Sequence, residues 1–545
     1  MKKALPIGND SFRIVRERDF YYVDKSLLIK DFIESRDTVA LVTRPRRFGK
    51  SLNMTMLREF FDITKDSSEI FNGLAIMDTE YAGQINSRPV IYFTFKDCKG
   101  NTPDLLLFKI GNTVLKEYEK YYDELIKDSA HDQNSKYHDF FMIYKKLRER
   151  SIDLKFLEIS IETLEKTVSS YYQTEPIVLI DEYDQPMICS VEYGYHDELK
   201  LFFSGLFGSA LKGQEYMYQA FLTGIQRVVK ESIFSQLNNI SVYTVLDEQY
   251  SGYFGLDAGE TEELLAYYDL PLDEGVKAKY NGYIFGSTEI YNPWSVLNYA
   301  KKGKLENYWI NTSTNALVHT SINAANGNFH KSFDKLVSEE VVTVSVDLGC
   351  SFIELKNNHT LWGLLINAGY VTVVERLSEN RMRVRIPNGE VKSEFQKIVT
   401  ERANLDSVDL DVMFQCLMAK EMDGFLDIYS ELVISCTSYF DAKENAYHML
   451  FLGMCVTLNK IYKITSNAEA GHGRSDIRME SLSAERPHIV IEFKQGGDID
   501  ALKEEALQQI LDNEYHAGLK GEVLCVGVAH DKKRCAVAHK TVIAS

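Results

Sequence analysis

The sequence lacks a long apolar run, a paired-cysteine pattern and an excess of positive charge. No apolar stretch approaches the roughly 18 residues that a membrane helix needs, so we expect no membrane span. Polar residues follow Met1 too soon for the apolar core of a signal peptide, which predicts a cytoplasmic protein. The eight cysteines include no Cys-x-x-Cys pair, which argues against a zinc site or a disulfide framework.

Positive charge is scarce, since 61 lysine and arginine residues stand against 79 acidic residues and give a formal net charge of −18. Such a balance disfavours nonspecific adhesion to nucleic acid or to anionic membranes. Any nucleic-acid site must therefore be local. With 545 residues, of which 45% are hydrophobic, the chain is long enough for several folded cores.

The most informative stretch is residues 43–51, Thr-Arg-Pro-Arg-Arg-Phe-Gly-Lys-Ser. An apolar, β-branched run precedes it and apolar residues at helical spacing follow it, which predicts strand, loop and helix. In that context the stretch is typical of a phosphate-binding loop, with Lys50 on the β/γ-phosphates and Ser51 on Mg²⁺. Arg44 stands where the pattern asks for glycine, so a basic turn that caps a helix is the alternative.

A second motif, at residues 176–184, is an apolar run that ends in Asp181 and Glu182. Beside a phosphate loop, Asp181 is expected to hold Mg²⁺ and Glu182 to orient or deprotonate the attacking water. An ordinary turn at the end of a strand is the alternative. The order of the two motifs, each with the neighbouring elements that its mechanism needs, favours nucleotide binding.

A further predicted strand, residues 218–224, ends beside Thr223, which is placed to sense a γ-phosphate. Arg227 and Lys230 follow as candidates for charge near the phosphates, with a surface arginine as an equal alternative for Arg227. Arg46 and Arg47 keep three open roles: contact with phosphate, contact with a neighbouring subunit, or solvation of the loop. The predicted nucleotide-binding residues are Arg46, Arg47, Gly49, Lys50, Ser51, Asp181 and Thr223.

Most of residues 5–300 resemble the AAA-ATPase-like proteins of bacteria. The matching motifs are Leu5-Pro-Ile-Gly8, Tyr21-Tyr-Val-Asp-Lys25, Arg44-Pro-Arg-Arg-Phe-Gly-Lys-Ser51, Asp181-Glu-Tyr-Asp184, Phe221-Leu-Thr-Gly224 and Lys230-Glu-Ser-Ile-Phe234. The resemblance implies a P-loop ATPase. It also implies that Arg44 is compatible with nucleotide binding, because the loop of this family typically reads Arg-Pro-Arg-Arg-Phe-Gly-Lys-Ser.

The C-terminal part carries a second acidic constellation on two predicted strands, residues 475–479 and 489–494. Asp476 lies 16 positions before Glu492 (492 − 476 = 16), so a hairpin can bring the two carboxylates together, and Lys494 shares a strand face with Glu492. This set suits Mg²⁺-assisted phosphodiester cleavage, with Lys494 stabilising the developing charge or positioning the nucleophile. A surface salt bridge on an edge strand is the alternative, which the pattern alone favours.

Residues 438–525 resemble the PD-(D/E)XK nuclease superfamily, in the branch often fused behind AAA-ATPase-like domains. The matching pieces are Tyr439-Phe440, Glu444, Tyr447-His448, Gly471-His-Gly-Arg-Ser-Asp476, Glu492-Phe-Lys494 and Ala506-Leu-Gln-Gln-Ile510. The resemblance implies that Asp476, Glu492 and Lys494 are catalytic, that Glu444 is a helix carboxylate near the metal and that Gln509 faces the site. The proline expected near the first aspartate is absent, since Ser475 precedes Asp476.

These observations predict a multidomain α/β protein. The predicted domains are an AAA-ATPase-like P-loop domain (1–240), a helical lid or connector (241–340), a small mixed, winged-helix-like domain (341–425) and a restriction-endonuclease-like domain (426–545). The predicted metal ligands are Ser51, Asp181, Glu444, Asp476 and Glu492. The predicted cofactors are ATP and Mg²⁺, and the predicted partner is nucleic acid, with DNA favoured, no membrane and a homo-oligomer left open.

The leading functional hypothesis is nucleotide-controlled, Mg²⁺-dependent cleavage of nucleic acid. A rival of another class is a signalling or assembly ATPase whose C-terminal domain binds without cutting. In a third hypothesis Arg44 prevents tight ATP binding and the N-terminal domain is a scaffold.

Overall fold

The structure is a computed structural model that describes residues 2–129, 136–150, 153–212, 215–227, 238–310, 316–323, 325, 327–338, 341–349, 358–402, 407–436, 444–458 and 461–544. The chain forms two compact units, residues 1–326 with 343–390 and residues 327–342 with 391–545. This division is coarser than the four predicted domains, whose boundaries stay predictions. Among the described residues, no helix is both long and apolar enough to cross a membrane.

A parallel five-stranded sheet in the order β2-β3-β4-β1-β5 organises the first unit. Its strands are β1 (Val39–Thr43), β2 (Val90–Thr94), β3 (Ile177–Asp181), β4 (Gln219–Gly224) and β5 (Ile240–Tyr243). Because all of them run the same way, their carboxyl ends meet at one edge, where α/β proteins bind ligands. The domain boundary predicted at residue 240 falls at the start of β5. The strand β5 itself is not among the predicted strands.

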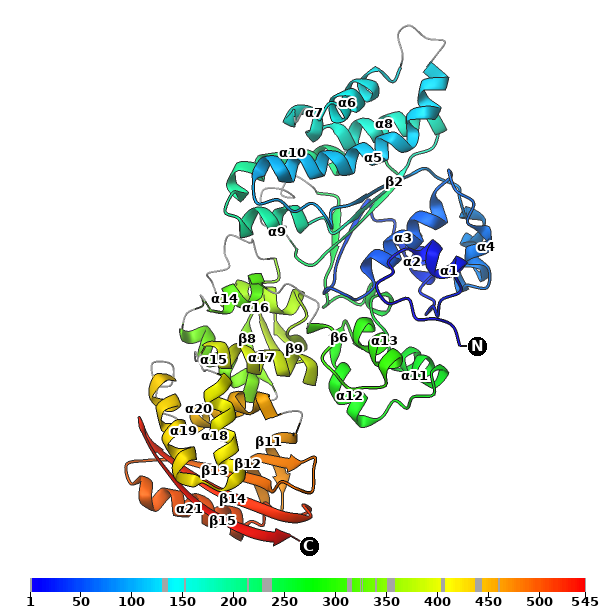
Figure 1. Cartoon of the computed structure of the whole chain (residues 1–545). Helices are drawn as coiled ribbons and strands as arrows, with labels where there is room; N and C mark the ends of the chain where they lie inside the picture. Colours follow the sequence, from blue (N-terminus) through cyan, green and yellow to red (C-terminus); the bar gives the residue numbers. More distant parts are fainter. Residues whose placement is uncertain are drawn as a thin grey trace. The chain divides into compact units, whose positions relative to one another are not determined.

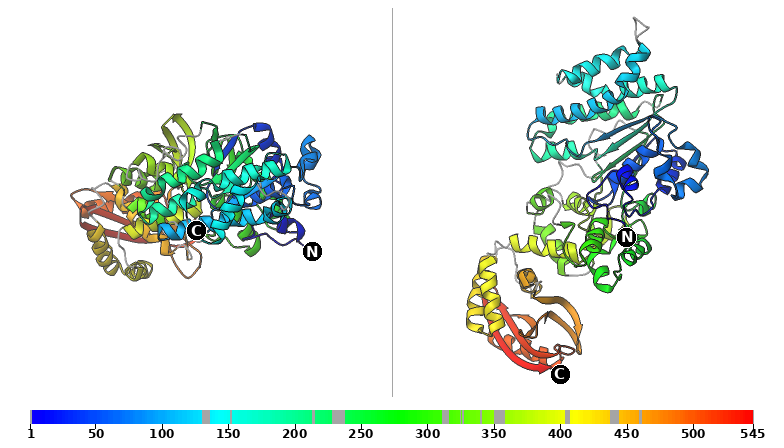
Figure 2. Two further views of the ribbon diagram at one scale, coloured as in Figure 1. Left: turned by 90° about the horizontal axis from the view of Figure 1, so that it is seen from above. Right: turned by 45° about the vertical axis from the view of Figure 1, so that its right-hand side comes forward.

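Helices cover both faces of this sheet (Figure 1), and Figure 2 shows the same arrangement from two further directions. Alternate strand residues such as Val178 and Ile180 pack into one core with α5, α6, α8 and α10. On the other face Phe32 of α2 lies edge-on to Phe221 of β4, with ring centroids 5.4 Å apart. The helices are α1 (Phe12–Glu17), α2 (Leu27–Ser35), α3 (Lys50–Phe61), α4 (Ser68–Phe71), α5 (Pro103–Ser129), α6 (His138–Arg148), α7 (Leu154–Glu158), α8 (Ser160–Tyr172), α9 (Gln185–Glu192) and α10 (His196–Lys212).

A mainly helical segment follows the sheet. It contains α11 (Ala258–Tyr267), α12 (Glu274–Tyr280), β6 (Tyr283–Phe285), β7 (Thr288–Ile290), α13 (Pro293–Lys302) and α14 (Ala316–Asn323). Helix α13 begins and ends at residues typical of helix termini. The side chain of Asn292 accepts from Ser295 N, Pro293 occupies the first turn, and Gly303 closes the helix with a left-handed φ of +66°.

Residues 343–390 pack against the loop that follows β1. They include α16 (Asn358–Asn367), β9 (Thr372–Ser378), β10 (Arg381–Arg385) and most of β8 (Val342–Ser345), and the three strands form a sheet in the order β8-β10-β9. A Cβ added to Gly369, whose φ is +83°, would lie 2.8 Å from the Cβ of Pro45. The amide of Asn367 donates to the side chain of Gln226, just after β4 (3.1 Å).

The second unit is a mixed five-stranded sheet in the order β11-β12-β13-β14-β15, in which only β13 and β14 are parallel. Its elements are α15 (Gly327–Ser338), most of α17 (Gly389–Arg402), α18 (Ser407–Ala419), α19 (Met422–Cys436), α20 (Glu444–Met454), β11 (Tyr462–Ala470), β12 (Gly473–Ser481), β13 (His488–Gln495), α21 (Ile499–Asp512), β14 (Gly521–Asp531) and β15 (Arg534–Ala544). Ile510 of α21 packs with Val490 on one face. Phe451 of α20 packs with Phe493 on the other.

Candidate functional site

The loop between β1 and α3 wraps around a buried lysine. Gly49 takes a left-handed conformation (φ +87°) that glycine adopts without strain, and Lys50 begins α3. The Lys50 ammonium donates to the carbonyls of Arg44 (3.0 Å) and Pro45 (2.8 Å). Burial lowers the pKa of Lys50, whereas the nearby acids, Glu182 foremost, raise it. A buried cation that donates to two carbonyls within its own loop is well placed to exchange them for anionic oxygens.

Asp181 joins three elements at the carboxyl edge of the sheet. One of its carboxylate oxygens accepts from the hydroxyl of Ser51 on α3 and the other from the hydroxyl of Thr223 on β4, both at 2.7 Å. Asp181 and Thr223 are fully or almost fully buried. The structure therefore brings together three of the predicted site residues, which come from segments far apart in the sequence.

A cavity of about 330 Å³ opens beside this cluster. Its lining includes Gly49, Lys50 and Ser51 together with further basic groups, Glu182, the N-terminal stretch 6–10 and the start of α13. The basic side chains around it are Arg46, Arg47, Lys50, Lys96 and Lys99. This concentration of positive charge suits a phosphorylated ligand.

Glu182 lines the cavity next to Asp181. Its φ of +52° is unusual for a residue other than glycine, and such strained positions cluster at functional sites. Burial, followed by the charge of Asp181, raises the pKa of Glu182 above its ordinary value. A carboxylate with a raised pKa is better matched to a proton-transfer role near neutral pH than an exposed glutamate.

Arg44, the departure from the expected glycine, turns into the protein. It has no exposed surface, and its guanidinium donates to the carbonyl of Thr43 at 2.8 Å. The guanidinium carbon lies 5.5 Å from the ring centroid of Phe254 and 5.2 Å from that of Phe285. Burial lowers the pKa of Arg44 to about 9. Arg44 is absent from the cavity lining, so its side chain leaves that space open.

Arg46 and Arg47 both line the cavity. The Arg47 guanidinium lies 4.3 Å from the ring centroid of Trp294 in the first turn of α13. The carbonyl of Arg46 accepts from the indole N–H of Trp309 at 3.0 Å. These contacts connect the loop to the segment around α13.

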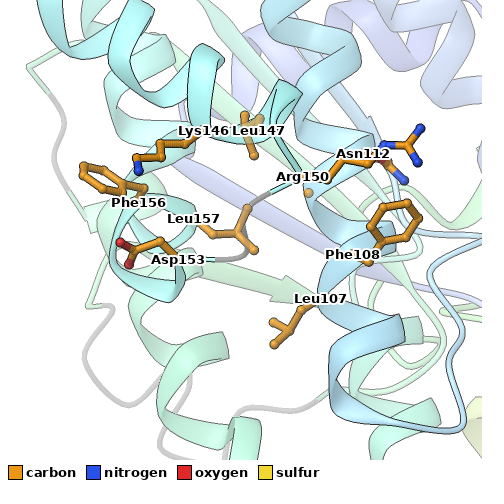
Figure 3. Close-up of a pocket in the computed structure, with 10 residues that line it drawn as sticks. Leu107, Phe108, Asn112, Lys146, Leu147, Arg150, Asp153, Phe156 and Leu157 are labelled. Carbon is orange, nitrogen blue, oxygen red and sulfur yellow. The ribbon is translucent and has the colours of Figure 1, made fainter.

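Arg227 lines a different cavity, of about 440 Å³, together with Asp247, Asp347 and Arg376. It is not among the residues that line the cavity around Lys50, and its role near the phosphates stays a prediction. Lys230 lies outside the described residues. A third pocket, of about 30 Å³, is formed by α5, α6 and the residues that follow α6 (Figure 3) and has room for little more than water.

The C-terminal acids meet where β12 lies beside β13. One carboxylate oxygen of Asp476 accepts from the main-chain N–H of Phe493 (2.8 Å), and the N–H of Asp476 donates to Glu492 (3.3 Å). The side-chain amide of Gln509 on α21 donates to the other oxygen of Glu492. Burial raises the pKa of Asp476, whereas the Phe493 N–H and the positive charge of Lys494 lower it.

Two further residues of the motifs matched in the C-terminal part are Glu444, a predicted metal ligand, and His448. Glu444 begins α20, but its side chain lies outside the described residues. His448 is buried, shares a 3.0 Å hydrogen bond with Ser466, and has its pKa lowered to about 4 by burial. No group of three or more His, Cys, Asp or Glu side chains in the described part of the chain is arranged to hold a metal ion.

The residues present fit the expected cofactors. The Ser51 hydroxyl and the Asp181 carboxylate are hard oxygen ligands that already lie 2.7 Å apart, which suits Mg²⁺. The neighbouring cations suit the oxygens of a nucleotide phosphate. At the other site Asp476 and Glu492 supply two carboxylates, a set that binds Mg²⁺ together with water or substrate oxygens.

Comparison with protein families matches both regions. A family described as predicted AAA-ATPase matches residues 6–234, and the PD-(D/E)XK nuclease superfamily matches residues 442–540. The chain joins an AAA-ATPase-like domain to a PD-(D/E)XK nuclease superfamily domain. A relative from Azotobacter chroococcum mcd 1, named as an uncharacterized protein in the vnfD 5′ region, is 24% identical over 446 residues, which cover 80% of this chain and 78% of the relative.

Several residues around the AAA-ATPase-like site had no role in the sequence analysis. Asp184 is buried and accepts from the main-chain N–H groups of Ile225 (2.9 Å) and Gln226 (2.8 Å), which fixes the loop after β4. The position of Asp184 three residues after Asp181, at the end of the same acidic motif, is the feature of the sequence that could have indicated a role at this site. Lys96 and Trp294 line the cavity from segments whose patterns predict only secondary structure.

Proposed function

We propose that this protein is an ATP-controlled, Mg²⁺-dependent nuclease. The observation that carries the proposal is the convergence of Asp476 and Glu492, with the charge of Lys494 acting on Asp476, at the junction of β12 and β13. The membership of this region in the PD-(D/E)XK nuclease superfamily supports a hydrolytic role.

In the nuclease-like domain Asp476 and Glu492 would hold Mg²⁺, while Lys494 would stabilise the developing charge or position the nucleophile. A bound Mg²⁺ lowers the pKa of a water molecule and polarises a phosphodiester. Gln509 orients Glu492 through its amide, and the N–H of Phe493 fixes Asp476. Glu444 remains a proposed further ligand.

In the AAA-ATPase-like domain Lys50, Arg46 and Arg47 would bind the phosphates of ATP, with the N–H of Gly49 completing the loop. Ser51 and Asp181 would hold Mg²⁺, and Thr223 keeps Asp181 oriented. Glu182 would orient or deprotonate the attacking water. ATP binding at this site would set the activity of the nuclease-like domain.

A nuclease assay on single- and double-stranded DNA and RNA, with Mg²⁺ and with or without ATP, tests the proposal. We expect the wild type to cut at least one of these forms in a manner that depends on ATP, Lys494→Ala to lose cutting but retain ATP turnover, and Lys50→Ala to lose ATP binding and the ATP dependence. Lys30→Ala is the matched control, since Lys30 lies on α2 near Glu34.

The outcomes separate the hypotheses. Nucleotide-dependent assembly with no cutting of any form would favour the signalling or assembly ATPase. Failure of the wild type to bind ATP in a calorimeter would favour the scaffold. The cytoplasmic location, DNA as the favoured substrate and a homo-oligomeric state stay predictions.

A further inference from the structure

A buried glutamate ties two separate elements together in the first unit. Glu390, only 1% exposed, lies in the first turn of α17. One of its carboxylate oxygens accepts from the main-chain N–H of Trp309 (2.6 Å), and the other accepts from the hydroxyl of Ser295 on α13 (2.7 Å). Each oxygen therefore holds a different segment.

Both segments reach the cavity beside Lys50. The indole N–H of Trp309 donates to the carbonyl of Arg46 in the loop. Ser295 shares the first turn of α13 with Trp294, which lines the cavity and lies under the guanidinium of Arg47. One chain of contacts thus runs from Arg46 through Trp309 to Glu390, and a second runs from Arg47 through α13 to the same carboxylate.

Burial makes these contacts stiff. If the loop or the start of α13 shifted alone, a carboxylate oxygen would lose a charge-assisted hydrogen bond in a place that water does not reach. It costs less free energy for Glu390 to move with its donors than to lose them. Glu390 is the last residue of the first unit, and α17 continues from Val391 with residues of the second.

We propose that Glu390 is the positioning residue through which nucleotide occupancy beside Lys50 sets the order of α17. This inference rests on the proposed nucleotide site and deepens it by naming how that site regulates the rest of the chain. A nucleotide that contacts Arg46, Arg47 and Trp294 fixes the loop and the start of α13. Both donors then hold Glu390 in one place, and the first turn of α17 opens less often.

Amide hydrogen exchange on the full-length protein tests the inference. Residues 393–398 of α17 are followed without nucleotide and with saturating ATPγS and Mg²⁺, while calorimetry measures binding. In the wild type we expect nucleotide to slow exchange there by roughly tenfold, the effect of securing one hydrogen bond to a charged group. Glu390→Gln should still bind nucleotide but lose most of this response. A merely structural role would change exchange equally with and without nucleotide.

Two milder variants keep the test decisive if Glu390→Gln folds poorly. Trp309→Phe removes the N–H that holds Arg46 while keeping an aromatic ring, and Ser295→Ala removes the other donor. Both variants should reduce the effect of nucleotide on exchange in α17. The control is Trp362→Phe, at a buried tryptophan on α16, which should leave this effect unchanged. Nucleotide binding without any α17 response in the wild type, or a full response in all three Glu390-network variants, overturns this inference alone. Absence of binding to the wild type overturns the proposed function as well.

Discussion

Asp181 ends β3 and Asp476 lies within β12, and different groups hold the two carboxylates. Asp181 accepts from two side-chain hydroxyls on α3 and β4. Asp476 accepts from a main-chain N–H on the neighbouring strand. Side-chain donors can be removed by single substitutions, whereas main-chain donors remain. We therefore expect the AAA-ATPase-like site to be the more easily disordered of the two.

The largest effect should come from Lys494→Ala. Because Lys494 is expected to stabilise charge that develops during cleavage, its removal should lower the cutting rate by roughly 10³-fold. The fold should survive, since the strand pairing that holds Asp476 is unchanged. Cutting and ATP turnover are measured on the same preparation, with Lys503→Ala on α21, where Lys503 pairs with Asp500, as the control. Unchanged cutting would remove Lys494 from the site.

Glu182→Gln should lower ATP hydrolysis by roughly 10²-fold while leaving ATP binding intact, as expected for loss of a general base. Burial raises the pKa of Glu182, so hydrolysis by the wild type should fall on acidification at a higher pH than an ordinary glutamate would give. The variant should lose that acidic limb. The exposed Glu192→Gln variant should behave as the wild type. An unchanged pH profile in Glu182→Gln would assign the limb to another group.

His448 should make the second unit sensitive to acid. Its folded-state pKa of about 4 lies below the unfolded value of 6.5, so the unfolded chain binds more protons between these values and stability falls as pH drops through this range. Between pH 7 and pH 5 the loss is about 2 kcal/mol. Urea unfolding at both pH values should show a smaller loss in His448→Gln. His472→Gln, at a side chain 76% exposed, should retain the full loss.

The smallest effect should come from Thr223→Val, which removes one donor to Asp181. We expect a loss of about 1 kcal/mol in the free energy of unfolding without ligand, because a buried carboxylate oxygen loses its partner. Mg²⁺ and ATP should recover part of it if Asp181 turns to the metal. Thr167→Val removes a comparable hydroxyl bond within α8, and its loss should not depend on ligand. Equal recovery in both variants would contradict the role of Thr223.

Local patterns allowed the main elements to be predicted. The strand, loop and helix around residues 43–51, the strand that ends at Asp181 and the pair β12 and β13 all occur as expected, and the α/β multidomain fold is confirmed. Each of these elements has an apolar run or a regular apolar spacing, which can be recognised from residues that are close together in the sequence.

What could not be predicted depends on tertiary contacts. β5 has only four residues, all partly exposed, so its pattern is too short to distinguish from a loop. The inward turn of Arg44 depends on Phe254 and Phe285, more than 200 positions away (254 − 44 = 210). Likewise Glu390 looks like an ordinary acid at the start of a helix, because nothing near it in the sequence indicates that Trp309 and Ser295 will bury it.

The close approach of Gly369 to Pro45 bears on how this protein can be divided or recombined. The AAA-ATPase-like match ends at residue 234, yet β5, Trp309 and Gly369, which contact β1 or the loop that follows it, lie beyond that residue. A fragment that ended there would lack the residues that pack against β1 and the loop after it. Residues 343–390 belong to the same compact unit as the loop after β1. If C-terminal domains were exchanged between relatives, the contacts of this loop would be kept only if the junction fell after Glu390.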